Sequence, residues 1–485
     1  MTSTRPEPTA RRSVFRRKPV DAFVTETRPD AEGGELQRSI GLFQLTLFGV
    51  GATIGTGIFI VLTEAVPEAG PAVIVSFILA GITAALTAVC YAELASTIPV
   101  SGSSYSYTYA TMGEIVAFGV AACLLLEYGV SSAAVSVGWS QYLNSLFSDV
   151  FGFRMPDAII AAPGEGGVLN LPAIVLVTLC CLLLVRGARE SALANTVMVL
   201  IKLGVLLLFI IIGFTAFSAS NFETFAPFGI AGIGAAASSI FFSFIGLDAV
   251  STAGEEVHNP RRNLPLAILF ATVVVTTFYI LVSLAALGAQ PYQDFAGQEA
   301  GLAAILRNIT GSNVWSAILA AGAVISIFSV TLVTLYGQTR ILFAMGRDGM
   351  LPEVFHRVDP RTLAPVRNTI IVGLFVGALA GFVPLGVLID LTSMGTLVAF
   401  TVVSIGVIIL RRTQPDLPRG FRVPGYPVTP ILSAASAIYI MSGLPLTTYG
   451  LFVVWLGIAA IIYFTYSMRH SQLGRGHAVA AEPPR

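Results

Sequence analysis

The fold is decided at residues 51–57, which read GATIGTG and lie inside the first long apolar stretch of the chain. Three glycines and two β-branched threonines within seven residues weaken an α-helix considerably. A helix interrupted within a membrane persists only where its freed backbone groups face a cavity or find other partners. Gly51 and Gly55 also form a GxxxG pair, which is typical of close helix packing. Residues 51–57 therefore indicate either a broken helix with a binding role or a tight helix contact.

The composition places this stretch in a membrane protein. Of 485 residues, 55% are hydrophobic and 11% are charged, whereas a soluble chain carries roughly a quarter charged residues. A soluble fold of this length has too little interior to bury so much apolar surface. The net charge of zero gives no reason to expect a nucleic-acid partner. The four cysteines lie in apolar stretches without metal-ligand or disulfide spacing, so we expect no metal and no cofactor.

Long apolar runs alternate with short polar breaks from residue 41 onward. A membrane-spanning helix needs roughly 20 apolar residues. This pattern predicts an all-α polytopic membrane protein with twelve transmembrane helices. The predicted spans are residues 41–66, 71–94, 113–139, 168–185, 192–217, 230–253, 264–287, 314–339, 368–383, 387–410, 429–445 and 449–466.

The positive charges orient these spans. Of 27 lysines and arginines, 24 fall in the tails and loops on one side, and only Arg154 and Arg307 fall on the other. The remaining one, Lys202, lies inside a span. Because cytoplasmic loops carry the excess of positive charge, this asymmetry predicts a multi-pass inner (plasma) membrane protein with both termini in the cytoplasm.

Both ends of the chain are polar. Residues 1–40 contain no apolar stretch of signal-peptide type and are rich in proline and arginine, so we expect a disordered cytoplasmic tail. Residues 41–468 form the predicted transmembrane domain, and residues 469–485 form a second cytoplasmic tail. The basic run Arg16 to Lys18 is typical of a solvated tail, with contact to anionic lipid as the alternative.

Three ionisable residues lie deep inside predicted spans, namely Glu127, Lys202 and Asp248. Each charge at a helix centre costs roughly 2.5–3.5 kcal/mol, and such groups tend to mark transport pathways. Other acids, including Glu93 and Glu114, lie close enough to span ends that we expect them to reach water. Desolvation favours the neutral amine, so Lys202 is a candidate for gaining and losing a proton. The alternative is a permanently paired structural cation.

A second interruption is predicted at residues 242–246, FSFIG, followed by Asp248. The two interruptions fall in spans one and six and are therefore five helices apart. This is the spacing expected if residues 41–217 and 230–410 form two inverted repeats of five helices, with the substrate held between broken helices 1 and 6. The helices at residues 429–466 are then two extra helices.

Several longer motifs strengthen this interpretation. They are GTG at 55–57, YAEL at 91–94 leading to PVSGSSY at 99–105, FIGLD at 244–248 leading to EEVHNP at 255–260, and GQTR at 337–340 with RDGMLP at 347–352. With these motifs in this order, the chain resembles the amino acid–polyamine–organocation superfamily, and within it the bacterial relatives of the cationic amino acid transporters. The resemblance covers nearly everything except the tails and implies a five-plus-five inverted repeat with two extra helices.

The resemblance also implies a substrate site at the first interruption. By motif position, the N–H groups of Thr56 and Gly57 would bind the carboxylate of an amino acid. The carbonyl of Thr53 would accept a hydrogen bond from the substrate amine. Ile54 and Gly55 complete the substrate-binding residues of this segment.

The second interruption would bind the other side of the same amine. By motif position, the carbonyls of Phe242, Ser243 and Ile245 would accept from it, and the Phe242 ring falls where the family places an aromatic gate. Lys202 falls where proton-coupled members carry a lysine in span five. Glu127 matches an acidic position of the cationic amino acid transporters and would face a cationic side chain.

The sequence therefore predicts a secondary active amino acid transporter and not an enzyme. We expect proton-coupled symport, with small neutral amino acids such as alanine placed ahead of arginine or lysine, because no second acid is clearly positioned for a guanidinium. An exchanger or polyamine carrier on the same fold is the alternative. Glu255 and Glu256 are expected to gate the cytoplasmic side. The expected partners are substrate, protons and lipid, and the sequence does not identify any small membrane partner.

Overall fold

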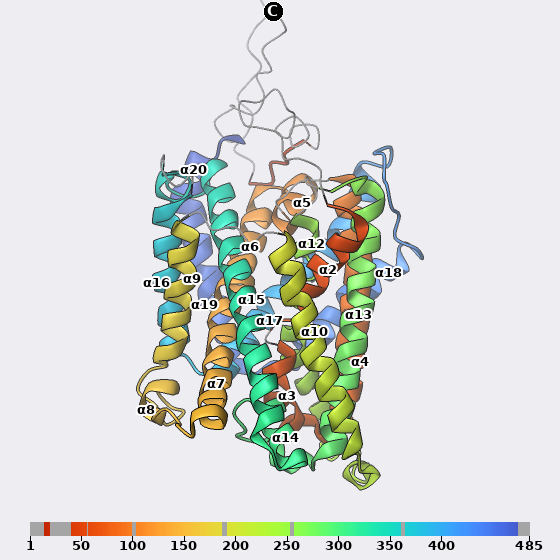
Figure 1. Ribbon diagram of the computed structural model, residues 1–485. Coiled ribbons are helices and arrows are strands. Elements are labelled where there is room, and N and C mark those ends of the chain that lie inside the picture. Colours follow the sequence, from red (N-terminus) through yellow and green to blue (C-terminus); the bar gives the residue numbers. More distant parts are fainter. Residues whose placement is uncertain are drawn as a thin grey trace, which may run out of the picture.

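The computed structural model describes residues 14–19, 40–55, 57–98, 103–186, 192–252, 257–359 and 364–473. Within these ranges the regular structure is helical, apart from one isolated bridge between Ile40 and Val257. Figure 1 shows the long helices running side by side as one bundle, with α5 and α20 toward one end and α8 and α14 toward the other. The predicted all-α class is confirmed.

The principal helices follow in chain order. They are α2 (Leu42–Thr53), α3 (Gly57–Ala69), α4 (Val73–Thr97), α5 (Ser103–Thr111), α6 (Glu114–Leu125), α7 (Ser131–Phe151), α8 (Asp157–Ile160), α9 (Leu171–Val185), α10 (Ala192–Thr215), α11 (Gly229–Phe241), α12 (Ala249–Thr252), α13 (Pro260–Ala289), α14 (Gly301–Thr310), α15 (Asn313–Arg347), α16 (Val366–Phe382), α17 (Leu385–Thr413), α18 (Val428–Met441), α19 (Leu446–Ile462) and α20 (Met468–His470).

Short helical turns join several of these helices. A π-helical turn, η2 (Leu126–Val130), connects α6 to α7, and a second one, η7 (Tyr463–Ser467), connects α19 to α20. The 3₁₀ turns are η1 (Gly70–Ala72), η3 (Ala219–Phe222), η4 (Phe242–Phe244), η5 (Tyr292–Phe295) and η6 (Glu353–Phe355).

The bundle has the length and surface of a membrane domain. Eight helical segments of the described chain are long and apolar enough to cross a bilayer, and α2, α9, α16 and α18 are shorter apolar helices. Large apolar side chains face outward, including Leu446 at 87% exposure and Phe43 at 74%. A bilayer is the solvent that tolerates such a surface. Some helices extend beyond their predicted spans, since α7 continues to residue 151 and α15 to residue 347. The count of twelve spans stays a prediction.

The packing pairs helices from the two halves of the chain. Helix α4 packs on α13, α7 packs on α15, and α9 packs on α16. These pairs bring together predicted spans two and seven, three and eight, and four and nine. Two interleaved repeats of five spans would produce such a pairing. The inverted relation between the repeats stays a prediction.

Both predicted interruptions are present. Helix α2 ends at Thr53 and α3 begins at Gly57. In the second half, α11 passes into η4, the backbone is extended at Ile245, and Gly246 adopts a φ of +91°. Because Gly lacks a Cβ, it adopts this left-handed conformation without strain. The chain therefore leaves the helix twice in the interior of the bundle.

Two acids expected to reach water are buried instead. Glu93 is 1% exposed and accepts from Arg411 Nε at 2.7 Å and from the Val423 amide at 2.6 Å. Glu114 is 0% exposed and accepts from Arg16 at 3.0 Å. Arginines distant in sequence reach both carboxylates, which sequence position alone did not indicate.

The contact of Arg16 also changes the interpretation of the N-terminal segment. Residues 14–19 lie against the bundle, since the Arg16 carbonyl accepts from the Glu114 amide at 2.9 Å and Lys18 Nζ lies 3.6 Å from Asp348. The prediction of a solvated or lipid-binding basic run was therefore wrong for Arg16 and Lys18. The Arg16 carbonyl satisfies one of the first α6 amides, which have no partner within the helix.

We predict that Glu93→Gln destabilises the protein by on the order of 3 kcal/mol, because it leaves the Arg411 guanidinium without its buried counter-charge. Thermal unfolding of the purified protein in detergent measures the change. Glu353→Gln is the matched control, because Glu353 pairs with Arg357 at 72% exposure and such pairs contribute little. Equal unfolding temperatures for the two variants would contradict the assigned role of Glu93.

Candidate functional site

The two interruptions touch each other through their backbones. A Cβ atom added to Gly57 would lie 2.5 Å from Cα of Ser243, and one added to Gly246 would lie 2.6 Å from the carbonyl oxygen of Ala52. Real Cβ atoms do not approach other atoms this closely, so the first interruption fits against the second only because both positions are glycine. The glycines therefore bring two sets of freed backbone groups to one place.

The backbone of the first interruption folds tightly on itself. Ile54 has φ −71° and ψ 77°, close to an inverse γ-turn, and the Gly55 amide donates to the Thr53 carbonyl at 2.7 Å. Beyond it, the first amides of α3 have no partner within the helix and carry the positive end of its dipole. Such an end suits the carboxylate of a substrate.

Lys202 satisfies two carbonyls at the end of α2. Its Nζ donates to the carbonyl of Gly51 at 2.8 Å and to that of Ile54 at 2.9 Å. The side chain is 1% exposed and reaches from α10, which packs on α2, α13 and α15. A cation is favourable at a helix C-terminus, where the unpaired carbonyls carry partial negative charge. Lys202 thus ties span five to the first interruption.

Tyr279 of α13 joins the two interruptions. Its hydroxyl lies 2.6 Å from the Ser243 carbonyl and 2.9 Å from the Thr53 carbonyl. The single phenolic proton serves one of these acceptors at a time. Both carbonyls were predicted to accept from a substrate amine. The Thr53 carbonyl already accepts from the Gly55 amide, so it has a lone pair for that amine only while the phenolic proton serves Ser243. Tyr279 carries no charge, so its position in the sequence does not distinguish it from the other aromatic residues of the spans.

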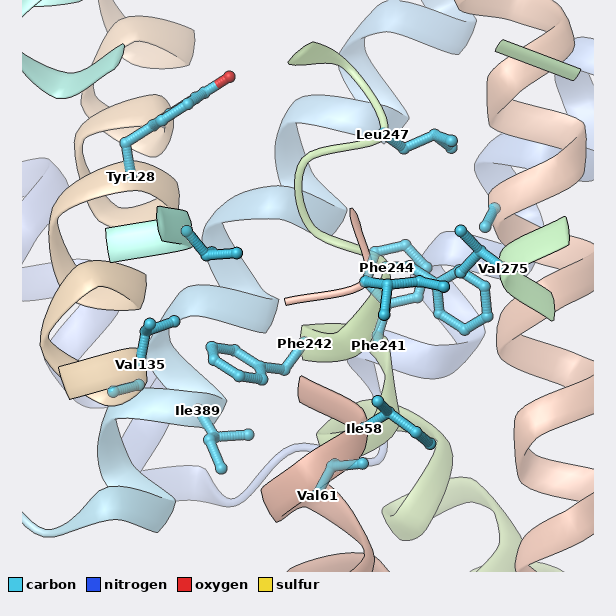
Figure 2. Close-up of a cluster of buried hydrophobic side chains, with 14 of the residues drawn as sticks. Ile58, Val61, Tyr128, Val135, Phe241, Phe242, Phe244, Leu247, Val275 and Ile389 are labelled. Carbon is cyan, nitrogen blue, oxygen red and sulfur yellow. The ribbon is translucent and has the colours of Figure 1, made fainter. Parts of the chain in front are cut away.

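Phe242 is buried and turns away from the aromatic residues next to it. Figure 2 shows its ring pointing toward Val135 of α7 and Ile389 of α17, while Phe244 lies on the other side, near Val275 of α13. The Phe244 ring contacts that of Tyr279 at a centroid distance of 5.2 Å. The surroundings of Phe242 in this view are therefore aliphatic.

Glu127 lies in the π-helical turn η2 and is 0% exposed. Both of its carboxylate oxygens are buried without a hydrogen-bond partner among the described residues. Asp248 and Thr396 are polar side chains within its electrostatic range. Asp248, which follows the second interruption, accepts from Ser103 Oγ at 2.9 Å and from the Tyr128 hydroxyl at 3.1 Å, both on Oδ2. The π turn places the Glu127 and Tyr128 side chains toward this cluster.

A small cavity adjoins the interruptions. Its volume is about 20 Å³, and its lining comes from α2, η2, α15 and the second interruption, with Gly51, Gly246 and Thr334 among the lining residues. This volume corresponds to about one water molecule. This cavity is therefore too small for an amino acid.

The predicted site residues divide into two groups. Thr53, Ile54, Gly55, Gly57, Phe242, Ser243 and Ile245 lie at the two meeting interruptions, with Lys202 bound to the first. Glu127 lies in the separate acidic cluster with Asp248. Thr56, Glu255 and Glu256 lie outside the described residues. No binding role of these residues is tested by the geometry, so all remain predictions.

The chain is similar to transporters over nearly its whole length. The amino acid permease family matches residues 40–478. The chain is 44% identical to a methylthioribose transporter of Bacillus subtilis (strain 168), over 96% of this chain and 100% of that protein. It is 42% identical to the branched-chain amino acid permease BcaP of the same organism, over 96% and 99%. It is also 37% identical to the vacuolar cationic amino acid transporter 2 of Arabidopsis thaliana, over 84% and 64%.

We predict that Gly57→Ala destabilises the protein by about 1–3 kcal/mol, because the new methyl group forces the interruptions apart. The unfolding temperature in detergent and ligand binding to the folded variant provide the measurement. Gly119→Ala in α6 is the control, since nothing lies within 4 Å of its added Cβ and alanine favours the helix. A Gly57→Ala variant as stable as the Gly119→Ala control would contradict the interlocked arrangement.

Proposed function

The chain belongs to the amino acid permease family, and on this premise we propose that it is a proton-coupled symporter of amino acids that works by alternating access. The family is one of membrane transporters and not of enzymes. The observation that carries the proposal is the pair of hydrogen bonds from Lys202 to the first interruption. Lys202 is titratable and is hydrogen-bonded to the segment expected to bind the substrate carboxylate, so its protonation state is coupled to the conformation of that segment.

The proposed coupling follows from the strength of these bonds. Hydrogen bonds from a charged donor contribute about 1.5–3 kcal/mol, against about 0.5–1.5 kcal/mol for neutral pairs. A protonated Lys202 therefore holds the Gly51 and Ile54 carbonyls, and with them the shape of the first interruption. Loss of the proton weakens this hold and releases the end of α2 from α10. Substrate and proton then favour the same conformation, which is the requirement for symport.

We propose neutral amino acids as the substrates. Phe242 of the second interruption points toward the aliphatic side chains of Val135 and Ile389 (Figure 2), which support a neutral side chain of the ligand. The similarity to BcaP, named for branched-chain amino acids, supports the same class. Cationic amino acids are the second candidate, supported by Glu127 and by the similarity to cationic amino acid transporters. The methylthioribose transporter adds a third ligand to test.

We further propose that the protein is a multi-pass protein of the plasma (inner) membrane with both termini in the cytoplasm. The charge asymmetry supports this orientation, because 24 of 27 lysines and arginines fall on the side of the termini. Figure 1 is consistent with it, since α20 and the beginning of α2 lie toward the same end of the bundle.

We predict that Lys202→Gln abolishes uptake driven by a pH gradient but retains exchange of substrate across the membrane. The neutral amide still donates hydrogen bonds but cannot carry the proton. Uptake and counterflow in proteoliposomes measure the two activities. Lys18→Gln is the control, since Lys18 is the other lysine of the chain and its ammonium lies 3.6 Å from Asp348 and not on the first interruption. Normal concentrative uptake by the Lys202→Gln protein would contradict the coupling role.

A thermal-shift panel tests the substrate class. We predict that alanine, valine, leucine or isoleucine raises the unfolding temperature, because a ligand of the folded state stabilises it by RT ln(1 + [L]/Kd). Arginine, lysine, spermidine and methylthioribose complete the panel. Stabilisation by arginine and lysine alone would replace the neutral class by the cationic class. Stabilisation by methylthioribose alone would contradict the proposed amino acid function.

A further inference from the structure

A cluster of buried polar atoms without partners lies beside the second interruption. Six side chains of the cluster contribute such atoms, and two of them are the carboxyl groups of Glu127 and Asp248. The atoms are Glu127 Oε1 and Oε2, Asp248 Oδ1, the hydroxyl oxygens of Tyr91, Ser104 and Tyr107, and Gln338 Oε1. Most buried polar groups in proteins have a partner, so such a group of exceptions requires an explanation.

The two carboxyl groups have different surroundings. Oδ2 of Asp248 accepts two hydroxyl hydrogen bonds, from Ser103 and Tyr128. Donors of this kind stabilise an ionised carboxylate. Neither oxygen of Glu127 has a donor at normal hydrogen-bond geometry among the described residues, and the hydroxyl of the neighbouring Thr396 donates to the Thr392 carbonyl. If one of the two carboxyl groups is neutral, Glu127 is the one whose surroundings favour the neutral form.

Among the described residues, no basic side chain compensates the pair. Neither Glu127 nor Asp248 forms an ion pair with any described lysine, arginine or histidine. The titratable side chains in electrostatic range of Glu127 are Asp248, Cys123 of α6, Tyr91 of α4 and Tyr128 of η2, with Tyr107 of α5 near Asp248. Two unpaired negative charges at 0% and 1% exposure would repel each other in a medium of low dielectric constant.

We propose that Glu127 and Asp248 form a second proton-binding site, distinct from Lys202, which holds one proton on Glu127 in this conformation. The bound proton makes the Glu127 carboxyl group a hydrogen-bond donor. Oδ1 of Asp248 is an acceptor without a donor. A single proton between the two carboxyl groups thus removes one of the two charges and supplies the missing hydrogen bond. The proton needs no further reactant, since it comes from water and returns to water.

The site is built to change occupancy when the conformation changes. The Ser103 hydroxyl belongs to the first residue of α5, and the Tyr128 hydroxyl belongs to η2, so Asp248 depends on donors from two elements. A movement that admits water to the cluster hydrates Glu127 and favours its ionised form. Proton release at this site then accompanies opening. This consequence rests on the proposed transport function, whereas the existence of the bound proton does not.

Infrared spectroscopy of the full-length protein in lipid nanodiscs at neutral pH tests the bound proton directly. A protonated carboxyl group gives a C=O stretching band that a carboxylate lacks. We expect a band in the wild-type protein that is lost in Glu127→Gln and retained in Glu127→Asp and in Asp248→Asn. Glu353→Gln, at an exposed ion pair, is the control that leaves the band unchanged.

Three results would overturn the proposal. The first is a wild-type spectrum without any difference from Glu127→Gln in this region, which would mean that Glu127 is ionised. The second is loss of the band in Asp248→Asn alone, which would place the proton on Asp248. The third is loss of the band in the exposed control. The infrared result does not depend on transport, so a protein that fails to carry amino acids can still confirm the proton site.

Discussion

The contact on which the rest of the site depends is the one between the Lys202 ammonium and the carbonyls of Gly51 and Ile54. A helix that ends inside a bilayer leaves carbonyl groups that water cannot reach, and each would cost several kcal/mol without a partner. The interrupted end of α2 finds hydrogen-bond donors within the protein for four of its carbonyls. Val50 accepts from the Ile54 amide and Thr53 from the Gly55 amide, Lys202 serves Gly51 and Ile54, and the Ala52 carbonyl packs against Gly246. By donating to two of these carbonyls, the Lys202 ammonium stabilises an interrupted helix inside the bilayer, where helices are usually continuous.

The same constraint explains why the two interruptions must meet. Freed backbone groups in hydrocarbon are tolerated only when protein surrounds them, and each interruption surrounds the other. Gly57 and Gly246 permit the approach, and the Tyr279 hydroxyl holds one carbonyl from each side. A movement that separates the interruptions has to give these groups new partners. The backbone charges of an amino acid are suited to that role, and in the proposed mechanism bound substrate would supply these partners.

Much of this arrangement follows from the sequence, because its causes are local. Apolar run length indicates helices in a membrane. Glycine density indicates the interruption at 51–57, and the short segment at 242–246 with Gly246, followed by Asp248, indicates the other. A lysine in the middle of an apolar span is exceptional. The features that the sequence did not reveal depend on contacts between distant segments. Tyr279 is an ordinary aromatic residue within a span until the carbonyls of Thr53 and Ser243 are placed beside it. Glu93 and Glu114 were expected to reach water, because nothing local indicated that Arg411 and Arg16 would reach them. The π-helical turn that carries Glu127 contains Gly129, but glycines also occur in the regular helices on either side, at Gly119 and Gly138, so glycine does not mark the turn.

The central claim is that the Lys202 ammonium is a proton-exchanging group held on the first interruption. The chain contains two lysines, so a Lys18→Arg protein labelled with ¹⁵N-lysine carries a single side-chain label at Lys202. Nuclear magnetic resonance of this protein in nanodiscs, recorded across a pH series with and without a ligand identified by thermal shift, reports the protonation state of Nζ. The account predicts that the Lys202 signal changes from the charged to the neutral form within the pH range over which the protein stays folded, and that bound substrate shifts this transition. A signal that stays that of a charged amine throughout, with or without ligand, would make Lys202 a fixed structural cation and would contradict the account.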